Sequence, residues 1–125
     1  MMTGGVFAQN DILGAAMQAA VVRDSVMSNN IANAETPNYK KYGVAFEEYL
    51  QKSVDNYKKT GVLDLSKAAP TVTRIHKNLS SRLDGNNVDV NEENVNLYQN
   101  SVVYDGLVNS VVSNYRLLNL VFSMK

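Results

Sequence analysis

The chain has 125 residues, enough for at most one domain with a modest hydrophobic core. Twelve basic and twelve acidic residues give a net charge of +0, so no electrostatic footprint indicates binding to nucleic acid or to an anionic membrane. The chain contains no cysteine, which excludes disulfides, thiolate metal sites and cysteine nucleophiles together.

The first ten residues contain no lysine or arginine and no continuous apolar run. We therefore expect no cleaved secretory signal peptide, and no segment has the length of a transmembrane helix. Residues 1–8 are small or uncharged and include glycine, which predicts a flexible start when the protein is alone.

A first helix is predicted over residues 10–33, beginning at Asn10 or Asp11 because an acid is favoured at a helix N-terminus. Apolar residues recur along it in two stripes that would face neighbouring helices. One stripe contains Ile12, Ala15, Ala19, Val22 and Val26, and the other contains Leu13, Ala16, Ala20 and Met27. The small alanines allow another helix to approach closely.

This helix ends in an asparagine-rich string, Ser28-Asn29-Asn30-Ile31-Ala32-Asn33-Ala34-Glu35-Thr36-Pro37-Asn38-Tyr39-Lys40. We expect Asn33 to adopt the left-handed cap conformation. Pro37 disfavours helix at Thr36, so the chain must turn there.

The middle of the chain alternates between patterns. Residues 43–59 have helical amphipathic spacing and predict a short surface helix, with Phe46, Tyr49, Leu50, Val54 and Tyr57 on one face. Residues 60–69 lose periodicity and predict a linker. Residues 71–76 alternate and are rich in β-branched side chains, which favours a short strand.

A second string, Leu83-Asp84-Gly85-Asn86-Asn87-Val88-Asp89, predicts a turn followed by an extended exit. Asp89 lies three residues before Glu92, the spacing of a capping box at the start of a helix. The inserted segment thus covers residues 34–88.

The last helix is predicted over residues 90–123. Residues spaced alternately four and three apart form a mostly apolar seam on one face of this helix, and the seam continues for more than four heptads. It consists of Val90, Asn94, Leu97, Ser101, Tyr104, Val108, Val111, Tyr115, Leu118 and Phe122. A helix of roughly 45–50 Å needs a partner along its length, and the first helix is the natural one. Its other faces are also apolar, which indicates that more than one side is covered. An ordinary small helical bundle is the alternative.

Both strings resemble signatures of the axial proteins of the bacterial flagellum, which form the rod, the hook and the hook-associated segments. The second string narrows the resemblance to the smallest basal-body proteins of the proximal rod. It rests on Asn30, Ile31, Ala32, Asn33, Thr36, Pro37, Tyr39, Asp84, Gly85, Asn86, Val88 and Asp89.

The resemblance implies a single axial-protein core domain over residues 1–125. The expected fold is mainly α: paired, coiled-coil-like N- and C-terminal helices with a short helix, a loop and a small β or extended segment inserted between them. The expected assembly interface consists of Ile12, Ala15, Ala19, Val22, Val26, Leu97, Tyr104, Val108, Val111, Tyr115, Leu118 and Phe122.

The function implied by the resemblance is a structural, self-assembling subunit of the drive shaft that transmits torque for motility. Its partners would be itself, other rod subunits, rotor-base proteins and the flagellar type III export apparatus. It would lie in the periplasmic rod of the basal body, exported without a cleaved signal peptide. The alternative is a soluble helical adaptor or export chaperone that binds an axial protein, although such chaperones are usually acidic.

No pattern indicates catalysis, a cofactor or a small-molecule substrate. The chain has one histidine, His76, and no cysteine to share a metal with it. The acids after Leu83 do not have the spacing of a calcium-binding EF-hand. Glu47 and Glu48 are adjacent, so on a helix they point about 100° apart and cannot converge on one substrate.

Overall fold

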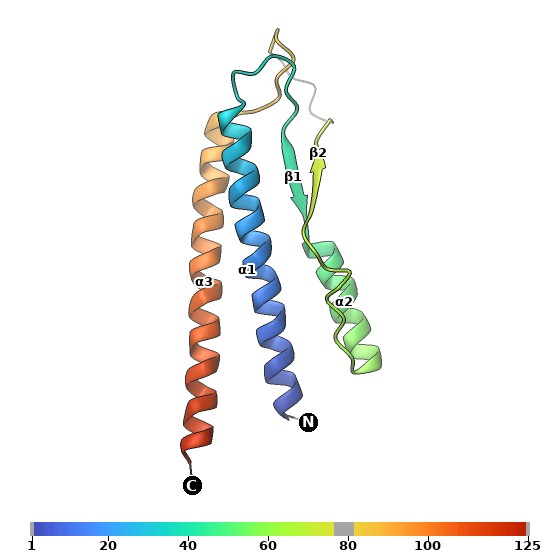
Figure 1. Ribbon diagram of the computed structural model, residues 1–125, viewed down its shortest axis with the longest axis vertical. Coiled ribbons are helices and arrows are strands. Elements are labelled where there is room, and N and C mark those ends of the chain that lie inside the picture. The colour runs from blue at the N-terminus through green and yellow to red at the C-terminus, as the bar shows by residue number, and fades with distance from the viewer. Residues whose placement is uncertain (1, 77–81, 125) are drawn as a thin grey trace.

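The computed structural model describes residues 2–76 and 82–124 and contains three helices and one two-stranded sheet. Helix α1 covers Met2–Ala32, strand β1 Tyr42–Ala45, helix α2 Glu47–Thr60, strand β2 Thr71–Arg74 and helix α3 Val90–Ser123. Helices α1 and α3 run side by side in opposite directions, with both chain ends at the same end of the molecule (Figure 1). The predicted fold of paired terminal helices around a small inserted segment is confirmed.

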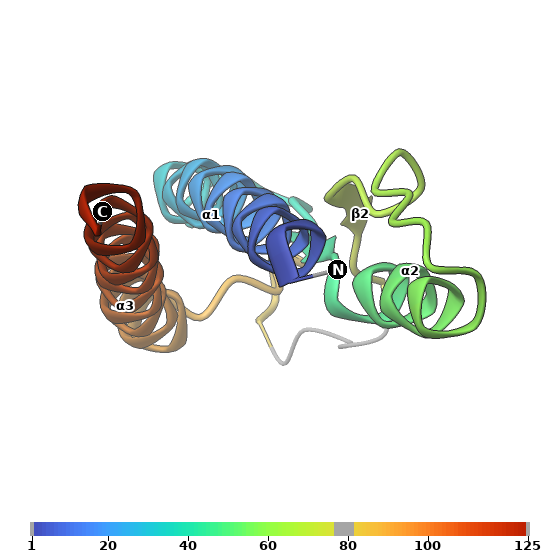
Figure 2. The same ribbon diagram turned by 90° about the horizontal axis from the view of Figure 1, so that it is seen from below.

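The inserted segment forms an arm that lies beside the helix pair; we use "arm" for residues 42–74, from β1 to β2. Seen end on, α1 lies between α3 on one side and the arm on the other (Figure 2). Both apolar stripes of α1 are therefore used. Ala20 lies at the α3 contact, where its carbonyl accepts a hydrogen bond from Asn100, whereas Ala15 lines a hollow with linker residues of the arm.

The first helix begins at Met2, so the predicted start at Asn10 or Asp11 was wrong. No proline interrupts residues 2–9, and Asp11 lies inside the helix as an exposed residue. The early part of α1 also has a partner in α3, because the Asn114 amide donates to Asn10 Oδ1 at 3.0 Å. That contact joins residues far apart in the sequence, which a local cap pattern cannot anticipate.

The prediction of helix over residues 43–59 was wrong at its beginning. Tyr42–Ala45 instead forms β1, which pairs antiparallel with β2 in the register Tyr42 with Arg74 and Val44 with Val72. A Cβ at Gly43 would lie 2.7 Å from Ile75 Cδ1, so a larger residue there would require the end of the Ile75 side chain to move. Helix α2 then covers Glu47–Thr60 and is terminated by the next residue, Gly61, whose φ of 74° is left-handed. The predicted strand is confirmed over Thr71–Arg74.

The apolar core is small. The buried apolar residues among those described are Ala19, Ala20, Ala34, Phe46, Ala68 and Val88. The largest fully buried side chains are instead two asparagines, Asn30 and Asn86. A fold whose deepest side chains are polar depends on hydrogen bonds being satisfied there, and these bonds lie at the junction between the helix pair and the arm.

Candidate assembly interface and the junction that orients it

Asn30, in the last turns of α1, uses all the hydrogen-bonding capacity of its amide. Its Nδ2 donates to the Tyr42 carbonyl at 2.8 Å and to Glu93 Oε2 at 3.1 Å. Its Oδ1 accepts from the Tyr42 backbone N–H at 2.9 Å and from the Tyr39 hydroxyl at 3.1 Å. A primary amide offers two donors and two acceptor lone pairs, so one side chain joins α1, β1 and α3 with nothing left unpaired.

Asn86 joins the loop after α1 to the loop before α3 in the same way, through side-chain hydrogen bonds to backbone groups. Its Nδ2 donates to the carbonyls of Asn33 and Thr36 at 2.9 and 2.8 Å, and its Oδ1 accepts from the Val88 N–H at 2.8 Å. The turn after α1 is thereby held by the turn before α3. The same two loops are also linked by their backbones, because the Asn38 N–H donates to the Asp84 carbonyl at 2.7 Å.

The neighbouring Asn87 binds the backbone next to both strands of the sheet. Its Oδ1 accepts from the Lys41 N–H at 2.7 Å, and its Nδ2 donates to the Ile75 carbonyl at 2.9 Å. Arg82 adds a bond from its guanidinium to the Ala34 carbonyl at 2.8 Å, and the Lys40 ammonium donates to the Gly85 carbonyl. We call these contacts, together with those of Asn30 and Asn86, the junction.

The predicted left-handed cap at Asn33 was wrong. Asn38 has the positive φ instead, at 61°. The Asn33 N–H still bonds the Asn29 carbonyl at 3.1 Å in helical fashion, so the reversal is delayed until after Pro37. Gly85 faces this point with φ 76°, and a Cβ there would lie 2.8 Å from Asn38 Oδ1. The two left-handed residues thus pack against each other and let the loops approach closely.

A buried ion pair lies beside Asn30. The Lys41 ammonium is 3.7 Å from Glu93 Oε1 and 3.6 Å from Glu92 Oε1, and the Lys41 and Glu93 side chains are almost fully buried. Lys41 directly precedes the arm and therefore ties its first strand, β1, to the first turns of α3. The capping prediction at Asp89 is confirmed, because its carboxylate accepts from the Asn91 and Glu92 N–H groups at 3.0 and 3.2 Å.

Tyr39 completes the junction on the arm side. Its ring meets that of Tyr42 edge to face, with centroids 6.3 Å apart. Burial, and next the neighbouring Tyr42, raise the pKa of the Tyr39 hydroxyl, which fits its role as a neutral donor to Asn30. On the outer side, the Arg74 guanidinium lies 4.8 Å from the Tyr42 ring centroid.

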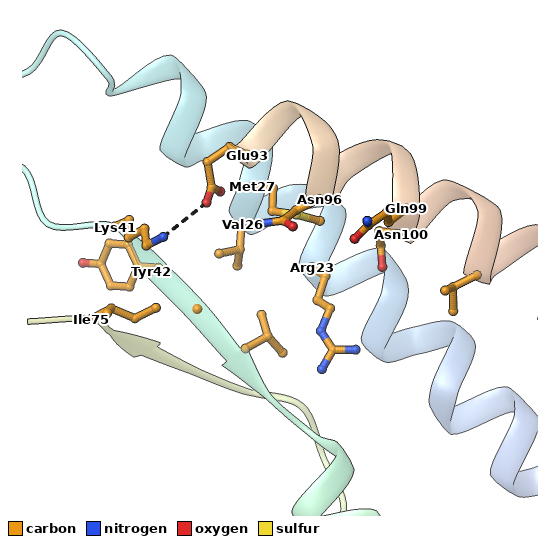
Figure 3. A pocket seen from close by; sticks show the side chains of 13 residues that line it. Arg23, Val26, Met27, Lys41, Tyr42, Ile75, Glu93, Asn96, Gln99 and Asn100 are labelled. Atoms are coloured by element: carbon orange, nitrogen blue, oxygen red, sulfur yellow. Dashed lines mark ion pairs between the residues drawn. The ribbon is translucent and has the colours of Figure 1, made fainter. Parts of the chain in front are cut away.

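A groove of about 330 Å³ lies between α1, α3 and the β1–β2 sheet (Figure 3). Lys41 and Glu93 face each other at one end of it, and Asn96, Gln99 and Asn100 line the α3 side. Among the residues that the structure describes, no group of three or more histidines, cysteines or acids is arranged to hold a metal ion.

The predicted interface residues divide into two groups. Ala19 is buried, while the remaining α1 positions Ile12, Ala15, Val22 and Val26, and on α3 Leu97, Tyr104, Val108, Val111 and Leu118, are half-buried. Tyr115 and Phe122 are 56 % and 75 % exposed. The face of α3 that packs on α1 is rotated from the predicted line and includes Asn96, Asn100, Leu107 and Asn114, all half-buried.

The rotation has a physical reason. Asn100 and Asn114 both donate across the helix pair, to the Ala20 carbonyl and to Asn10 Oδ1. Asparagines that make such bonds belong inside a helix contact, but a hydropathy pattern places them outside. Large apolar residues of α3 remain exposed on several sides of the helix, with Val103 also lining the groove beside the sheet and Met124 directly following the helix: Val95, Tyr98, Val102, Val103, Val112, Tyr115, Leu117, Leu120, Val121, Phe122 and Met124. We call this set the outer face of α3.

Some residues of the two signature strings lie in the junction and others lie outside it. Asn30, Asn33, Thr36 and Tyr39 meet Asp84, Gly85 and Asn86 in the junction. Val88 is buried beside them, whereas Ile31 is half-buried and Ala32 and Pro37 are exposed. Lys41, Asn87 and Glu93 also belong to the junction, although no pattern in the sequence predicted them. The high asparagine content was the available indication, since buried asparagines are found where backbone groups need side-chain partners.

Comparison with known proteins bears directly on these two strings. The model of the flagella basal body rod protein family matches residues 11–40, from α1 to the end of the first string. A flagellar basal body rod protein FlgB from Borrelia hermsii is 32% identical over 119 residues, which covers 80% of this chain and 84% of that protein. The chain belongs to the FlgB family of flagellar basal-body rod proteins.

Other FlgB proteins are similar to this chain to the same degree. The one from Bacillus subtilis (strain 168) is 32% identical over 113 residues, covering 86% of this chain and 88% of the relative. The one from Yersinia enterocolitica is 31% identical over 102 residues, covering 71% and 74%. The family predicted from the two strings is therefore confirmed. In the described part of the chain, no helix is long and apolar enough to cross a membrane.

Proposed function

We propose that the chain is a structural subunit of the proximal rod of the flagellar basal body, and that it assembles through the outer face of α3 together with the predicted interface residues. The supporting observation is that outer face. It extends from Val95 to Met124 along almost the whole helix, and its large apolar side chains are 42–75 % exposed. So many exposed apolar side chains, on several sides of one helix in a chain with so small a core, mark protein–protein contacts.

The scarcity of charge on α3 supports the same reading. After Glu93 the helix carries only Asp105 and Arg116 as charged residues up to its end at Ser123. Neighbouring subunits that bury such helices against one another in a heterologous arrangement generate a tube instead of a closed dimer. Torque transmission then needs no chemistry from this chain. It needs apolar helices packed tightly enough to resist shear, and an arm held at a fixed angle by the junction.

Passage through the flagellar export apparatus in an unfolded state, without cleavage of a signal peptide, belongs to this proposal. The absence of cysteine supports it, because no disulfide can block unfolding. The modest core supports it too, since few apolar side chains must be exposed before passage. Rod subunits, further copies of this chain and rotor-base proteins would be the partners. The adaptor or chaperone alternative gains no support from membership in a rod family.

The test compares two aspartate substitutions on the same helix. Val111 is half-buried and lies one turn before Asn114, which donates across the helix pair, whereas Leu117 is 61 % exposed on the outer face. Val111→Asp places a charge within the helix pair and should lower the stability of the isolated chain and abolish assembly. Leu117→Asp should leave the stability of the isolated chain within about 0.5 kcal/mol of the original and still prevent incorporation.

The readout is an immunoblot of washed hook–basal bodies, with swimming as the second measure. The original chain should be retained after detergent and salt washing, and both variants should be absent. Retention of the Leu117→Asp chain at normal levels, with normal swimming, would refute the role of the outer face. An original chain found in the cytosol beside one axial protein, and missing from basal bodies, would favour the adaptor.

A further inference from the structure

The helix pair has a second groove, on the side away from the one in Figure 3. It has a volume of about 220 Å³ and is lined by Ala20, Val21, Asp24, Asn100, Ser101 and Tyr104. Val21 and Arg23 differ by two positions on α1, so their side chains point about 160° apart around the helix. Arg23 lines the groove beside the arm, so Val21 and this second groove face the other way. We call it the back groove.

The back groove is apolar with an acidic edge. Val21 is 56 % exposed although it is a large aliphatic residue. Asp24 is exposed, and it makes no salt bridge with any residue that the structure describes. Asp105, one turn along α3 from Ser101, adds a second exposed carboxylate on this side. The groove therefore presents an exposed aliphatic side chain beside exposed carboxylates.

The free end of the arm has the complementary character. Lys58 and Lys59 lie exposed in the last turn of α2, and neither forms an ion pair within residues 2–76 or 82–124. Val62 follows directly and is 66 % exposed. We call residues 58–62 the arm tip. Lysines at a helix C-terminus are favoured by the helix dipole, but the exposed valine beside them has no such local reason.

The charge and shape of these two surfaces lead to one assignment, which rests on the proposed role as a rod subunit. We propose that the arm tip of one copy docks in the back groove of a second copy of this chain. Val62 enters the hollow beside Val21 and Tyr104, and the two lysines lie against Asp24. An apolar anchor surrounded by charge pairs is the usual plan of a specific interface.

The arrangement explains how copies would follow one another around the rod. In a single chain, α1 separates the arm from α3 (Figure 2), and the back groove opens on the α1–α3 contact. Tip and groove are different surfaces, so each copy donates a tip to one neighbour and accepts one from another. Such a heterologous contact repeats without using up either surface, whereas the outer face of α3 stays available for other contacts.

The first test reverses charges. The variant Lys58→Glu, Lys59→Glu should lower the amount of chain per basal body about tenfold or more, because like charges would meet at Asp24. Adding Asp24→Lys should restore at least half of the original amount. Adding Glu35→Lys instead gives the same net charge at an exposed acid outside the groove and should restore nothing. Equal rescue by both additions, or by neither, would overturn the proposal.

The second test uses the absence of cysteine in the native chain. Lys59→Cys and Asp24→Cys are placed in one chain, and basal bodies are treated with a bifunctional maleimide. A heterologous contact predicts a ladder of linked chains, since each copy carries both halves. Arg23→Cys with Glu47→Cys is the control for the reagent, because these side chains contact each other within one chain and should give only an internally linked monomer.

The outcomes separate this proposal from the broader one. A ladder from the Lys59–Asp24 pair supports the docking. A chain that is retained in basal bodies but gives only monomers or dimers with this pair overturns the docking and leaves the rod role standing. A cysteine-free chain that is absent from basal bodies removes both, because there is then no assembly in which copies could meet.

Discussion

The side-chain amide of Asn30 pairs with both backbone groups of Tyr42, donating to its carbonyl at 2.8 Å and accepting from its N–H at 2.9 Å. This is how a neighbouring strand would satisfy those groups. Strand β1 has β2 on one edge, and at Tyr42 a helix side chain takes the place of a strand on the other. The arm is thus attached to α1 by an interaction that fixes direction as well as distance.

Asn30→Ala should destabilise the protein by about 3 kcal/mol, because several buried polar groups lose their partner together. Those groups are the Tyr42 N–H and carbonyl, the Tyr39 hydroxyl and one Glu93 oxygen. Denaturant unfolding followed by circular dichroism measures the change. The matched control is Asn29→Ala, one residue earlier and exposed, which should cost no more than about 0.5 kcal/mol. Equal effects at both positions would contradict the role given to Asn30.

Lys41 and Glu93 should show coupling in a double-mutant cycle. Removing one member of a buried ion pair leaves an uncompensated charge, so Lys41→Met alone should cost about 3 kcal/mol. Glu93→Gln in the same chain removes the remaining charge, and the double variant should be more stable than the sum of the single effects by about 1 kcal/mol or more. Additive effects in the denaturant midpoints would show that the two charges do not interact.

Two glycines should respond oppositely to alanine. Gly85 has φ 76°, and a Cβ there would lie 2.8 Å from Asn38 Oδ1, so Gly85→Ala should destabilise by about 1–3 kcal/mol. Gly106 lies in α3, and a Cβ there would meet nothing within 4 Å. Gly106→Ala should therefore stabilise by about 0.5–1 kcal/mol. Thermal unfolding of both variants checks the signs, and a stable Gly85→Ala protein would mean that the two loops need not approach closely.

Glu47 should give a small, salt-sensitive pH dependence. The hydrogen bond from Arg23 lowers the pKa of the Glu47 carboxyl below its ordinary 4.5. A depressed folded pKa contributes stability above the unfolded pKa, and that stability is lost as pH falls through the folded value. Because the Glu47 side chain is 68% exposed, solvent screening limits the contribution to at most about 1 kcal/mol. Arg23→Met should remove it, and the difference between the two proteins should vanish at low pH and in high salt.

Local patterns in the sequence predicted several elements correctly. The spacing of Asp89 and Glu92 identified the start of α3, since a cap depends only on residues within one turn. The β-branched run beginning at Thr71 identified β2. The two strings identified the family, because a dozen positions in fixed order are far more specific than any periodicity. The predicted membership of Tyr115 and Phe122 in an assembly interface stays a prediction, to be tested in basal bodies.

The errors share one physical origin. Where a residue's state depends on a partner distant in the sequence, the local pattern gave the wrong result. Asn10 belongs inside α1 opposite Asn114, Tyr42 is extended because Asn30 binds its backbone, and Asn38 takes the left-handed turn that Asn33 was expected to take. None of these partners lies within one helical turn of the residue it affects.

By itself, the sequence determined that two long apolar helices pair at the ends of the chain. Each apolar residue on one side of a helix adds to the area that can be buried there. The spacing of apolar residues is therefore enough to predict that the helix packs against a partner. Only the tertiary structure decided which face of α3 meets α1 and which stays open to partners. That choice depends on hydrogen bonds made by Asn100 and Asn114 across the pair, and a hydrogen bond needs both partners in place before it stabilises anything.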